Sequence, residues 1–334
     1  MNHNQLTNLC NSFELGTPLN TPNRVHGGLL HMMWRIKTDE ASYAVKQLSP
    51  DIDLTNEAII KNYDLTEEIA SRFSDLGIPA VSAIKQSGNY LTLVDGTAFL
   101  IYPWVDVQPL HHDTVSESHA LKIAEILAKM HLINLDVPEI DDPVFDVHSN
   151  DNLLALIQKT NSCNCPFATT LIKLQHDIIA INTAYQNTLP LLKQQVVVSH
   201  GDLDPKNVLW DANDKPILID WECARKLNPT HEIVNASLDW SGITTSFNQA
   251  LFIKMMRAYS AAGGRLDKDL LQAAFNGVLG NWINWMVYNI ERACMMQEYE
   301  QKTLGIEQVN QVLKTITTLI NIIPGLMTSI TEKI

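Results

Sequence analysis

Residues 196–222 constrain the fold of this chain more than any other stretch, because they read as short strands joined by polar loops. β-Branched and aliphatic side chains favour buried strands. Apolar runs of this kind occupy residues 196–198, 208–210 and 216–219. The sequence Asp-Ala-Asn-Asp at 211–214 supplies side chains typical of a tight turn. The stretch therefore predicts a strand, a loop and then a β-hairpin.

Three polar side chains stand where these predicted strands begin or end, namely Asp202, Asn207 and Asp220. Carboxylate and amide oxygens suit Mg²⁺, which keeps several waters and usually also takes phosphate oxygens. Asn207 and Asp220 are therefore candidate metal ligands. Asp202 precedes Asn207 by a short loop, from which it could point at a substrate hydroxyl. The simpler alternative is a polar hairpin whose carboxylates cap turns.

Two motifs in this stretch resemble a known family. The segment His200-Gly-Asp-Leu-Asp-Pro-Lys-Asn207 resembles the catalytic loop of the aminoglycoside phosphotransferase and choline kinase family. Its spacing also matches the protein-kinase loop H-R-D-L-x-x-x-N. Ile219-Asp-Trp-Glu222 resembles the second metal motif of the family, which stands where protein kinases have D-F-G.

The resemblance implies a role for each polar residue of the two motifs. Asp202 would be the catalytic base or the group that orients the acceptor hydroxyl. Asn207 and Asp220 would bind Mg²⁺, and His200 would support the loop. Lys206 either adds positive charge near the γ-phosphate of ATP or faces solvent as an ordinary loop lysine.

A third motif lies upstream, where Tyr43-Ala-Val-Lys46 resembles the V-A-I-K strand whose lysine contacts the α- and β-phosphates. A lysine in an apolar strand needs an anionic partner, because an unpaired buried charge is costly. Gly27 and Gly28 precede it and could offer backbone N–H groups to phosphates, since they carry no Cβ. The alternatives are a turn at the glycines and an edge-strand lysine that faces water.

The expected partner of Lys46 is a glutamate on the next helix, predicted over residues 65–76 by its apolar spacing. We choose Glu67, because the resemblance implies an acidic residue early in this helix. Glu68 and Glu57 stay open as alternatives.

Residues 24–48 predict a β-hairpin with its turn at residues 39–41. Three further apolar runs, at 81–85, 90–95 and 97–105, predict strands that complete a five-stranded antiparallel sheet. Pro103 cannot donate to a strand ladder and so ends the last run. The resemblance implies that this exit is a hinge that binds adenine. The residues concerned are Tyr102, Pro103, Trp104 and Val105. A hydrophobic strand exit without a ligand is the alternative.

From residue 106 onward the pattern is mostly helical. Helices are expected at 116–132, 152–160, 169–194, 247–263, 267–299 and 305–330. The predicted class is therefore α+β, with the two-lobed protein-kinase-like fold that the resemblance implies. A small antiparallel β-sheet lobe with the nucleotide site would span residues 1–104. A mostly helical lobe with the catalytic loop and the acceptor site would span 105–334.

Four residues are candidates for the acceptor site. Trp282, Trp285 and Glu291 could line an acceptor cleft together with Glu222, since aromatic rings and carboxylates suit a sugar or an amine. The same tryptophan spacing is typical of a helix stripe that packs in the core, which is the favoured reading. The resemblance also implies that Asp239 buttresses the catalytic loop, and a helix N-cap role is the alternative.

Composition limits the function. The chain has 334 residues and a formal charge of −13, which argues against sequence-independent binding of nucleic acid. Five cysteines, an odd number without a regular framework, suggest reduced thiols and a cytoplasmic setting. The N-terminus lacks the pattern of a signal peptide, and no uninterrupted apolar run is long enough to span a bilayer, so no membrane association is expected.

Together these features predict an ATP- and Mg²⁺-dependent phosphotransferase that acts on a hydroxyl of a small molecule. An aminoglycoside-like antibiotic, an amino alcohol and a sugar metabolite are the candidate acceptors. The alternatives are a non-catalytic nucleotide-binding protein of the same fold and a protein kinase. The absence of an A-P-E-like segment and the short space for an activation loop count against a protein kinase. The sequence does not indicate the oligomeric state.

Overall fold

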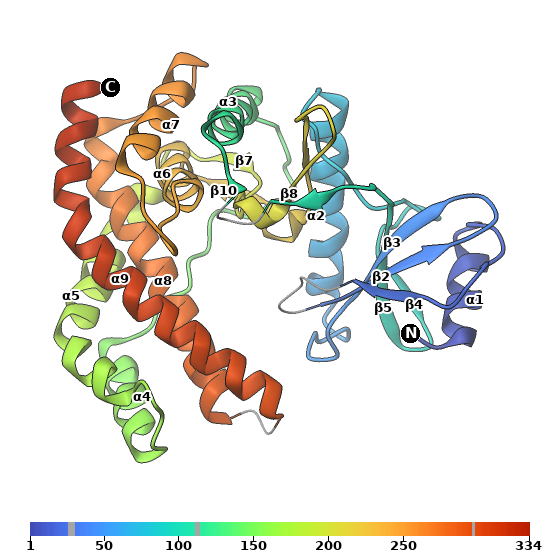
Figure 1. Cartoon of the computed structure of the whole chain (residues 1–334), viewed down its shortest axis with the longest axis horizontal. Coiled ribbons are helices and arrows are strands. Elements are labelled where there is room, and N and C mark those ends of the chain that lie inside the picture. The colour runs from blue at the N-terminus through green and yellow to red at the C-terminus, as the bar shows by residue number, and fades with distance from the viewer. Residues whose placement is uncertain (26–30, 111–113, 296–297) are drawn as a thin grey trace. The chain divides into compact units, whose positions relative to one another are not determined.

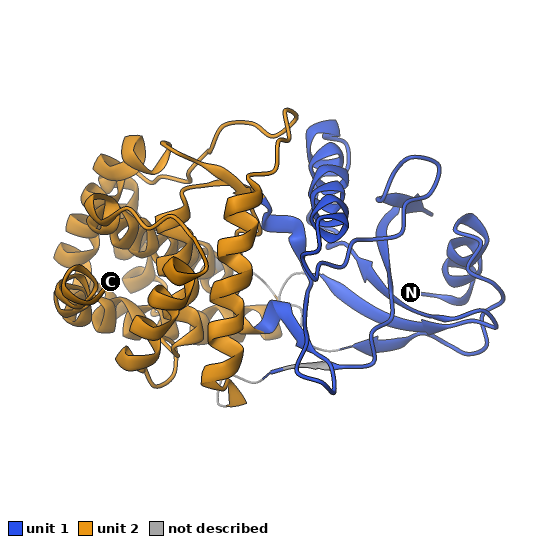
Figure 2. Ribbon diagram, turned by 90° about the horizontal axis from the view of Figure 1, so that it is seen from above, with its two compact units in different colours: residues 1–110, 206–224 blue, residues 111–205, 225–334 orange. Residues whose placement is uncertain are grey.

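The computed structural model describes residues 1–25, 31–110, 114–295 and 298–334. It divides into two compact units, coloured separately in Figure 2. The first, here called the sheet unit, contains Met1–Leu110 and Lys206–Ala224. The second, the helical unit, contains His111–Pro205 and Arg225–Ile334. The predicted domains at 1–104 and 105–334 stay a prediction.

The sheet unit is built on an antiparallel sheet in the order β1-β2-β3-β5-β4 (Figure 1). Its strands are β1 Asn23–Val25, β2 Met32–Lys37, β3 Ser42–Gln47, β4 Thr92–Val94 and β5 Thr97–Pro103. Successive side chains of a strand point to opposite faces. Phe99 and Ile101 therefore pack with helix α1, His3–Ser12, while Ala98 and Leu100 pack with Tyr63 of helix α2, Glu57–Asp75.

One predicted strand, residues 81–85, does not form. The Ile84 N–H does donate to the Ile101 carbonyl of β5, but the Val81 N–H bonds the Leu218 carbonyl and the Ala83 N–H bonds the Glu67 carboxylate, so the segment forms no continuous ladder with the sheet. The fifth strand of the sheet is β1 instead, which pairs with β2. Helix α2 also begins earlier than the predicted residue 65, because Asn56 caps its N-terminus by accepting from the Ala58 N–H.

The hairpin predicted after residue 207 is present in the sheet unit. It consists of β8 Val208–Trp210 and β9 Pro216–Leu218, and β6 Gln108–Pro109 extends it at one edge. The short 3₁₀ turn η3, Trp221–Cys223, follows β9. The Trp221 ring stacks on Phe73 of α2, with ring centres 5.5 Å apart. The hairpin is therefore held against the same helix that carries Glu67.

The described part of the helical unit contains seven α-helices, the short 3₁₀ turn η4 Lys268–Leu270 and one two-stranded ribbon. The helices are α3 Glu117–Ile133, α4 Asn150–Ser162, α5 Ala168–Leu192, α6 Pro229–Trp240, α7 Gln249–Ala261, α8 Leu271–Met295 and α9 Tyr299–Lys333. The ribbon joins β7 Val197–Ser199 to β10 Arg225–Leu227. Helix α8 packs against α5, α6 and α9, and an aliphatic core that includes Ile178, Ile283 and Ile316 joins α5, α8 and α9. The predicted α+β class, with an antiparallel N-terminal sheet and a mostly helical C-terminal part, is confirmed.

Helix α9 bears on the expectation that the chain does not associate with a membrane. Polar residues such as Gln311 and Lys314 interrupt its apolar positions, so no continuous apolar run is visible. Among the described residues it is nevertheless the one helix long and apolar enough to cross a membrane, and 39% of its most apolar window is buried inside the protein. A core helix of a soluble protein meets the same criteria, so this feature is weak evidence for a membrane span.

The close approach of α5 and α8 leads to a stability prediction. A Cβ atom added at Gly280 would collide with the Tyr185 ring, whereas one added at Gly325 of α9 would meet no atom within 4 Å. We expect Gly280→Ala to destabilise the protein by about 1–3 kcal/mol through overpacking. Gly325→Ala should stabilise it by about 0.5–1 kcal/mol, because alanine favours a helix interior. Urea denaturation of both variants measures the difference, and equal effects would contradict the packing of these helices.

Candidate active site

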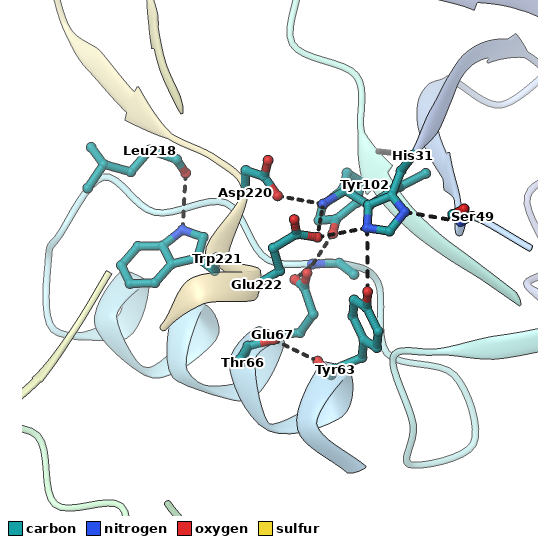
Figure 3. Close-up of polar contacts among 12 residues, drawn as sticks. His31, Ser49, Tyr63, Thr66, Glu67, Tyr102, Leu218, Asp220, Trp221 and Glu222 are labelled. Carbon is teal, nitrogen blue, oxygen red and sulfur yellow. Dashed lines mark hydrogen bonds and ion pairs between the residues drawn. The ribbon is translucent and has the colours of Figure 1, made fainter. Parts of the chain in front are cut away.

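Lys46 is the centre of the candidate site in the sheet unit. It lies on β3, opposite Leu100 of β5, and only 6% of its surface is exposed. Its Nζ atom lies 2.5 Å from Oδ1 of Asp220 and 3.1 Å from Oε2 of Glu222 (Figure 3). Burial acts to lower the pKa of Lys46, but the charges of Asp220 and Glu222 outweigh burial and raise that pKa above its ordinary value. The lysine is therefore a charged group held between two carboxylates.

The hairpin brings the two predicted metal ligands to one end. Val208 pairs with Leu218, and the Ile219 N–H donates to the Asn207 carbonyl at 3.0 Å. Asn207 is 3% exposed and directly precedes β8. One residue, Ile219, separates Asp220 from the end of β9. Asp220 has a left-handed backbone with φ of 64°, which bends the chain into η3. Asp adopts this conformation more readily than most residues, so the turn fits its position.

Glu67, the predicted partner of Lys46, has other hydrogen bonds. Its carboxylate accepts from the Tyr102 hydroxyl at 2.5 Å and from the Ala83 N–H at 2.6 Å. Burial raises the pKa of Glu67 to about 7, against the opposing effect of these bonds. Its negative charge acts on Lys46 without forming an ion pair in the described structure. The ion partners of Lys46 are instead the two hairpin carboxylates.

The two other candidate glutamates of α2 lie away from Lys46. Glu68 pairs with Lys85 at 2.8 Å and accepts from the Tyr90 hydroxyl, at the surface. Glu57 is exposed in the first turn of the helix. Of the three, Glu67 is thus the one buried beside the lysine.

Glu222 is held by a histidine that the sequence did not single out. His31 Nε2 lies 3.1 Å from Glu222 Oε2, and the Ser49 N–H donates to His31 Nδ1. Since Nδ1 accepts, the neutral ring carries its proton on Nε2 and donates it to Glu222. Burial acts to raise the pKa of Glu222, but the His31 bond and the Lys46 charge outweigh it and lower that pKa to about 2.

The structure gives side-chain contacts for two of the four residues predicted to form the hinge, Tyr102 and Trp104. Tyr102 pairs with Ala44 in the sheet, and its side chain reaches Glu67. The Trp104 N–H donates to the Ser42 carbonyl, and the Arg35 guanidinium lies 4.3 Å from the Trp104 ring centre. Pro103 ends β5 as predicted, and Val105 follows it half-buried. Binding of adenine here stays a prediction. Gly27 and Gly28 lie outside the described residues.

In the helical unit, buried side chains bond the start of the predicted catalytic loop. The buried His200 ring accepts the Asp202 N–H at Nδ1, at 3.3 Å. The Gly201 N–H donates to Glu232 Oε1 at 3.0 Å, and the other oxygen of Glu232 lies 2.8 Å from His131 Nε2. Burial acts to raise the pKa of Glu232, but the bond from His131 outweighs it and lowers that pKa. A fixed negative charge thus holds the peptide next to Asp202.

Sequence reasoning missed Glu232, because nothing near it in the chain marks it as a partner of residue 201. Asp239, which was predicted as the buttress, accepts a hydrogen bond from Asn235 one turn earlier in α6. Its role toward the loop stays a prediction. Lys206 is exposed in the short 3₁₀ turn η2, Pro205–Asn207.

The four residues predicted for the acceptor lie in different surroundings. Trp282 and Trp285 pack against the aliphatic core of the helical unit, and Trp285 donates to Gln308. Glu291 instead lines an open hollow of about 320 Å³ with His148, Asn152 and Lys159. Glu222 belongs to the sheet unit, beside Lys46. The structure therefore does not group the tryptophans with Glu291 in this hollow.

The raised pKa of Glu67 makes a prediction about stability. Its folded value of about 7 lies above its ordinary value of 4.5, so the folded state favours the protonated form. The protonated Glu67 therefore contributes roughly 3 kcal/mol to the free energy of unfolding. This contribution is fully present below pH 4.5 and is lost as the pH rises through 7. We expect Glu67→Gln to gain stability relative to the wild type as the pH rises from 5 to 8, measured by urea denaturation. A difference that does not change with pH would contradict the burial of this carboxyl. Glu68→Gln is the control on the same helix.

Comparisons with known proteins identify the family and the fold of this chain. A model of the phosphotransferase enzyme family matches residues 22–268. No curated protein sequence matches the chain.

Three solved structures illustrate the fold. Spectinomycin phosphotransferase APH(9)-Ia, solved with ADP and spectinomycin, is 11% identical with a TM-score of 0.70, and the match covers 96% of this chain and 99% of that one.

The choline kinase LicA from Streptococcus pneumoniae is 16% identical with a TM-score of 0.62, over 95% of this chain and 100% of that one. The amicoumacin kinase hAmiN, solved with AMP-PNP and Ca²⁺, is 11% identical with a TM-score of 0.65, over 92% of both chains. At these identities the likeness establishes the fold alone. It confirms the predicted kinase-like fold, and the family model, which covers most of the sequence, shows that this chain belongs to the phosphotransferase enzyme family.

Proposed function

We propose that this protein transfers the γ-phosphoryl group of ATP to a hydroxyl group of a small molecule. The observation that carries the proposal is the pairing of buried Lys46 with Asp220 at 2.5 Å in the sheet unit. A phosphate-binding cation and a metal-binding carboxylate are the two charged groups that phosphoryl transfer needs on the donor side. Their pairing joins residues from motifs that are 174 positions apart in the chain.

The donor set of the hairpin fits Mg²⁺. Asn207 and Asp220 stand at the same end of β8 and β9, joined by the bond from the Ile219 N–H to the Asn207 carbonyl. Mg²⁺ is commonly held by one or two protein oxygens together with phosphate oxygens, so a larger cluster of acidic residues is not required. When bound, the ion would supply positive charge that neutralises the phosphates. Two solved proteins of this fold carry ADP, or AMP-PNP with Ca²⁺, which supports a nucleotide and a divalent ion here.

On the acceptor side, Asp202 takes the role of base or hydroxyl-orienting group. Asp202 and Asn207 are five positions apart in the sequence, in one loop. The bonds of Gly201 to Glu232 and of the Asp202 N–H to His200 fix the backbone that carries this carboxylate. A fixed carboxylate is what proton transfer from a hydroxyl requires, since its efficiency depends on position.

The acceptor class that we propose is a hydroxylated small molecule. Proteins of this fold include kinases named for spectinomycin, choline and amicoumacin, so both antibiotics and amino alcohols belong in a screen. A non-catalytic nucleotide-binding protein is the second candidate, and a protein kinase is the third. We propose a cytoplasmic enzyme without nucleic-acid partners, in keeping with its formal charge of −13.

A screen of acceptors tests this function. ADP release is followed with Mg²⁺ and ATP over aminoglycosides, spectinomycin, choline, ethanolamine and sugars. We expect one class to be phosphorylated, and Asp202→Asn to lower the rate about 100- to 10,000-fold, while ATP still binds. Asp211→Asn, which changes a turn carboxylate of the neighbouring hairpin, is the matched control and should keep its rate.

Other outcomes separate the rivals. ATP binding without turnover on any acceptor would favour the non-catalytic protein. Labelled polypeptide with no labelled small molecule would favour a protein kinase. Full activity of Asp202→Asn would remove the proposed catalytic role of that residue.

A further inference from the structure

Lys46 needs a counter-charge that does not depend on the metal. Its ammonium is almost completely buried, and an uncompensated buried charge costs several kcal/mol. Under the proposed function, Asp220 shares its charge with a divalent cation. Glu67 is committed to the Tyr102 hydroxyl and the Ala83 N–H and makes no ion pair with Lys46 in the described structure. The remaining carboxylate at the lysine is Glu222, at 3.1 Å.

A single oxygen atom of Glu222 serves two partners. Oε2 lies 3.1 Å from Lys46 Nζ and also 3.1 Å from His31 Nε2. The histidine ring is in turn fixed, since the Ser49 N–H donates to its Nδ1 at 3.1 Å and the Tyr63 hydroxyl lies 3.4 Å from its Nε2. Figure 3 shows the ring of His31 between Ser49 and Glu222, with Tyr63 below it. The ring therefore has one orientation, in which its N–H points at Glu222.

The elements that carry these groups meet only in the folded sheet unit. His31 directly precedes β2, Lys46 lies in β3 and Glu222 lies in η3, after the hairpin. Stacking of Trp221 on Phe73 holds η3 against α2, and this fixes the backbone of the neighbouring Glu222. Both the backbone and the carboxylate of Glu222 are thus set before any ligand arrives, which is the property of a preorganised binding site.

We propose that Glu222 and His31 are the positioning pair of Lys46: Glu222, rather than a glutamate of α2, holds the ammonium for the nucleotide phosphates, and His31 holds Glu222. This inference rests on the proposed function, because it assigns the phosphate-binding role to Lys46. It gives Glu222 a place on the donor side of the reaction, in contrast to the acceptor role predicted from the sequence. A purely structural tie between β2 and the hairpin is the alternative.

Calorimetric titration with Mg²⁺ and AMP-PNP tests the pair without any acceptor. We expect Glu222→Gln and His31→Leu each to weaken nucleotide binding about 10- to 100-fold. His31→Gln should bind close to the wild type, because its amide N–H can still donate to Glu222. The double variant Glu222→Gln with His31→Leu should bind no more weakly than Glu222→Gln, because residues that act in series through one atom are not additive. Glu68→Gln is the surface control.

Four results would overturn the inference. The first is additive losses in the double variant, and the second is a larger loss for Glu67→Gln than for Glu222→Gln. The third is wild-type binding by Glu222→Gln. The fourth is a loss of binding that only follows a loss of stability, seen in the urea denaturation of the same variants. If the wild type itself binds no Mg²⁺ and AMP-PNP, the proposed function fails and takes this inference with it. If the wild type binds and the variants bind equally well, only the positioning pair is refuted.

Discussion

The buried positive charge of Lys46 is the constraint on which the sheet unit depends. An ammonium inside a protein is tolerated only when carboxylates surround it, and those carboxylates come from Asp220 and Glu222, 174 and 176 residues further along the chain. The requirement joins residues 206–224 to the N-terminal sheet and makes the unit discontinuous in sequence. Stacking of Trp221 on Phe73 adds an apolar contact that keeps the carboxylates in place.

Local patterns predicted much of the fold and of the donor site. The hairpin at 208–218 follows from apolar runs and a turn, and Lys46 and Asp220 follow from motif spacing. The strand predicted at 81–85 was wrong. Its alternation resembles a strand and the Ile84 N–H bonds β5, but the backbone donors of Val81 and Ala83 bond Leu218 and Glu67 instead of a neighbouring strand. The alternation of apolar and polar residues does not show which acceptor a backbone N–H will bond. Tertiary contacts therefore determine the conformation of residues 81–85.

Two histidine–glutamate pairs that we did not predict join residues far apart in the sequence. His31 meets Glu222 across 191 residues, and His131 meets Glu232 across 101. No local pattern encodes such a pair, since each member alone looks like an ordinary core histidine or a helix glutamate. Each pair contacts a residue, or its neighbour, for which we propose a function: Glu222 faces Lys46, and Glu232 accepts from the peptide before Asp202. A carboxylate that is bonded to a buried histidine thus occurs in both the sheet unit and the helical unit.

The most direct test of the account is a crystal structure with AMP-PNP and Mn²⁺, in which anomalous scattering locates the metal. The account predicts a manganese peak within bonding distance of Asp220 and Asn207 oxygens, with Lys46 Nζ bonded to a nucleotide phosphate. Glu222 should still accept from His31 in that structure. A manganese peak away from the hairpin, or a nucleotide whose phosphates do not contact Lys46, would contradict the central claim that the lysine and the hairpin form one phosphate-binding site.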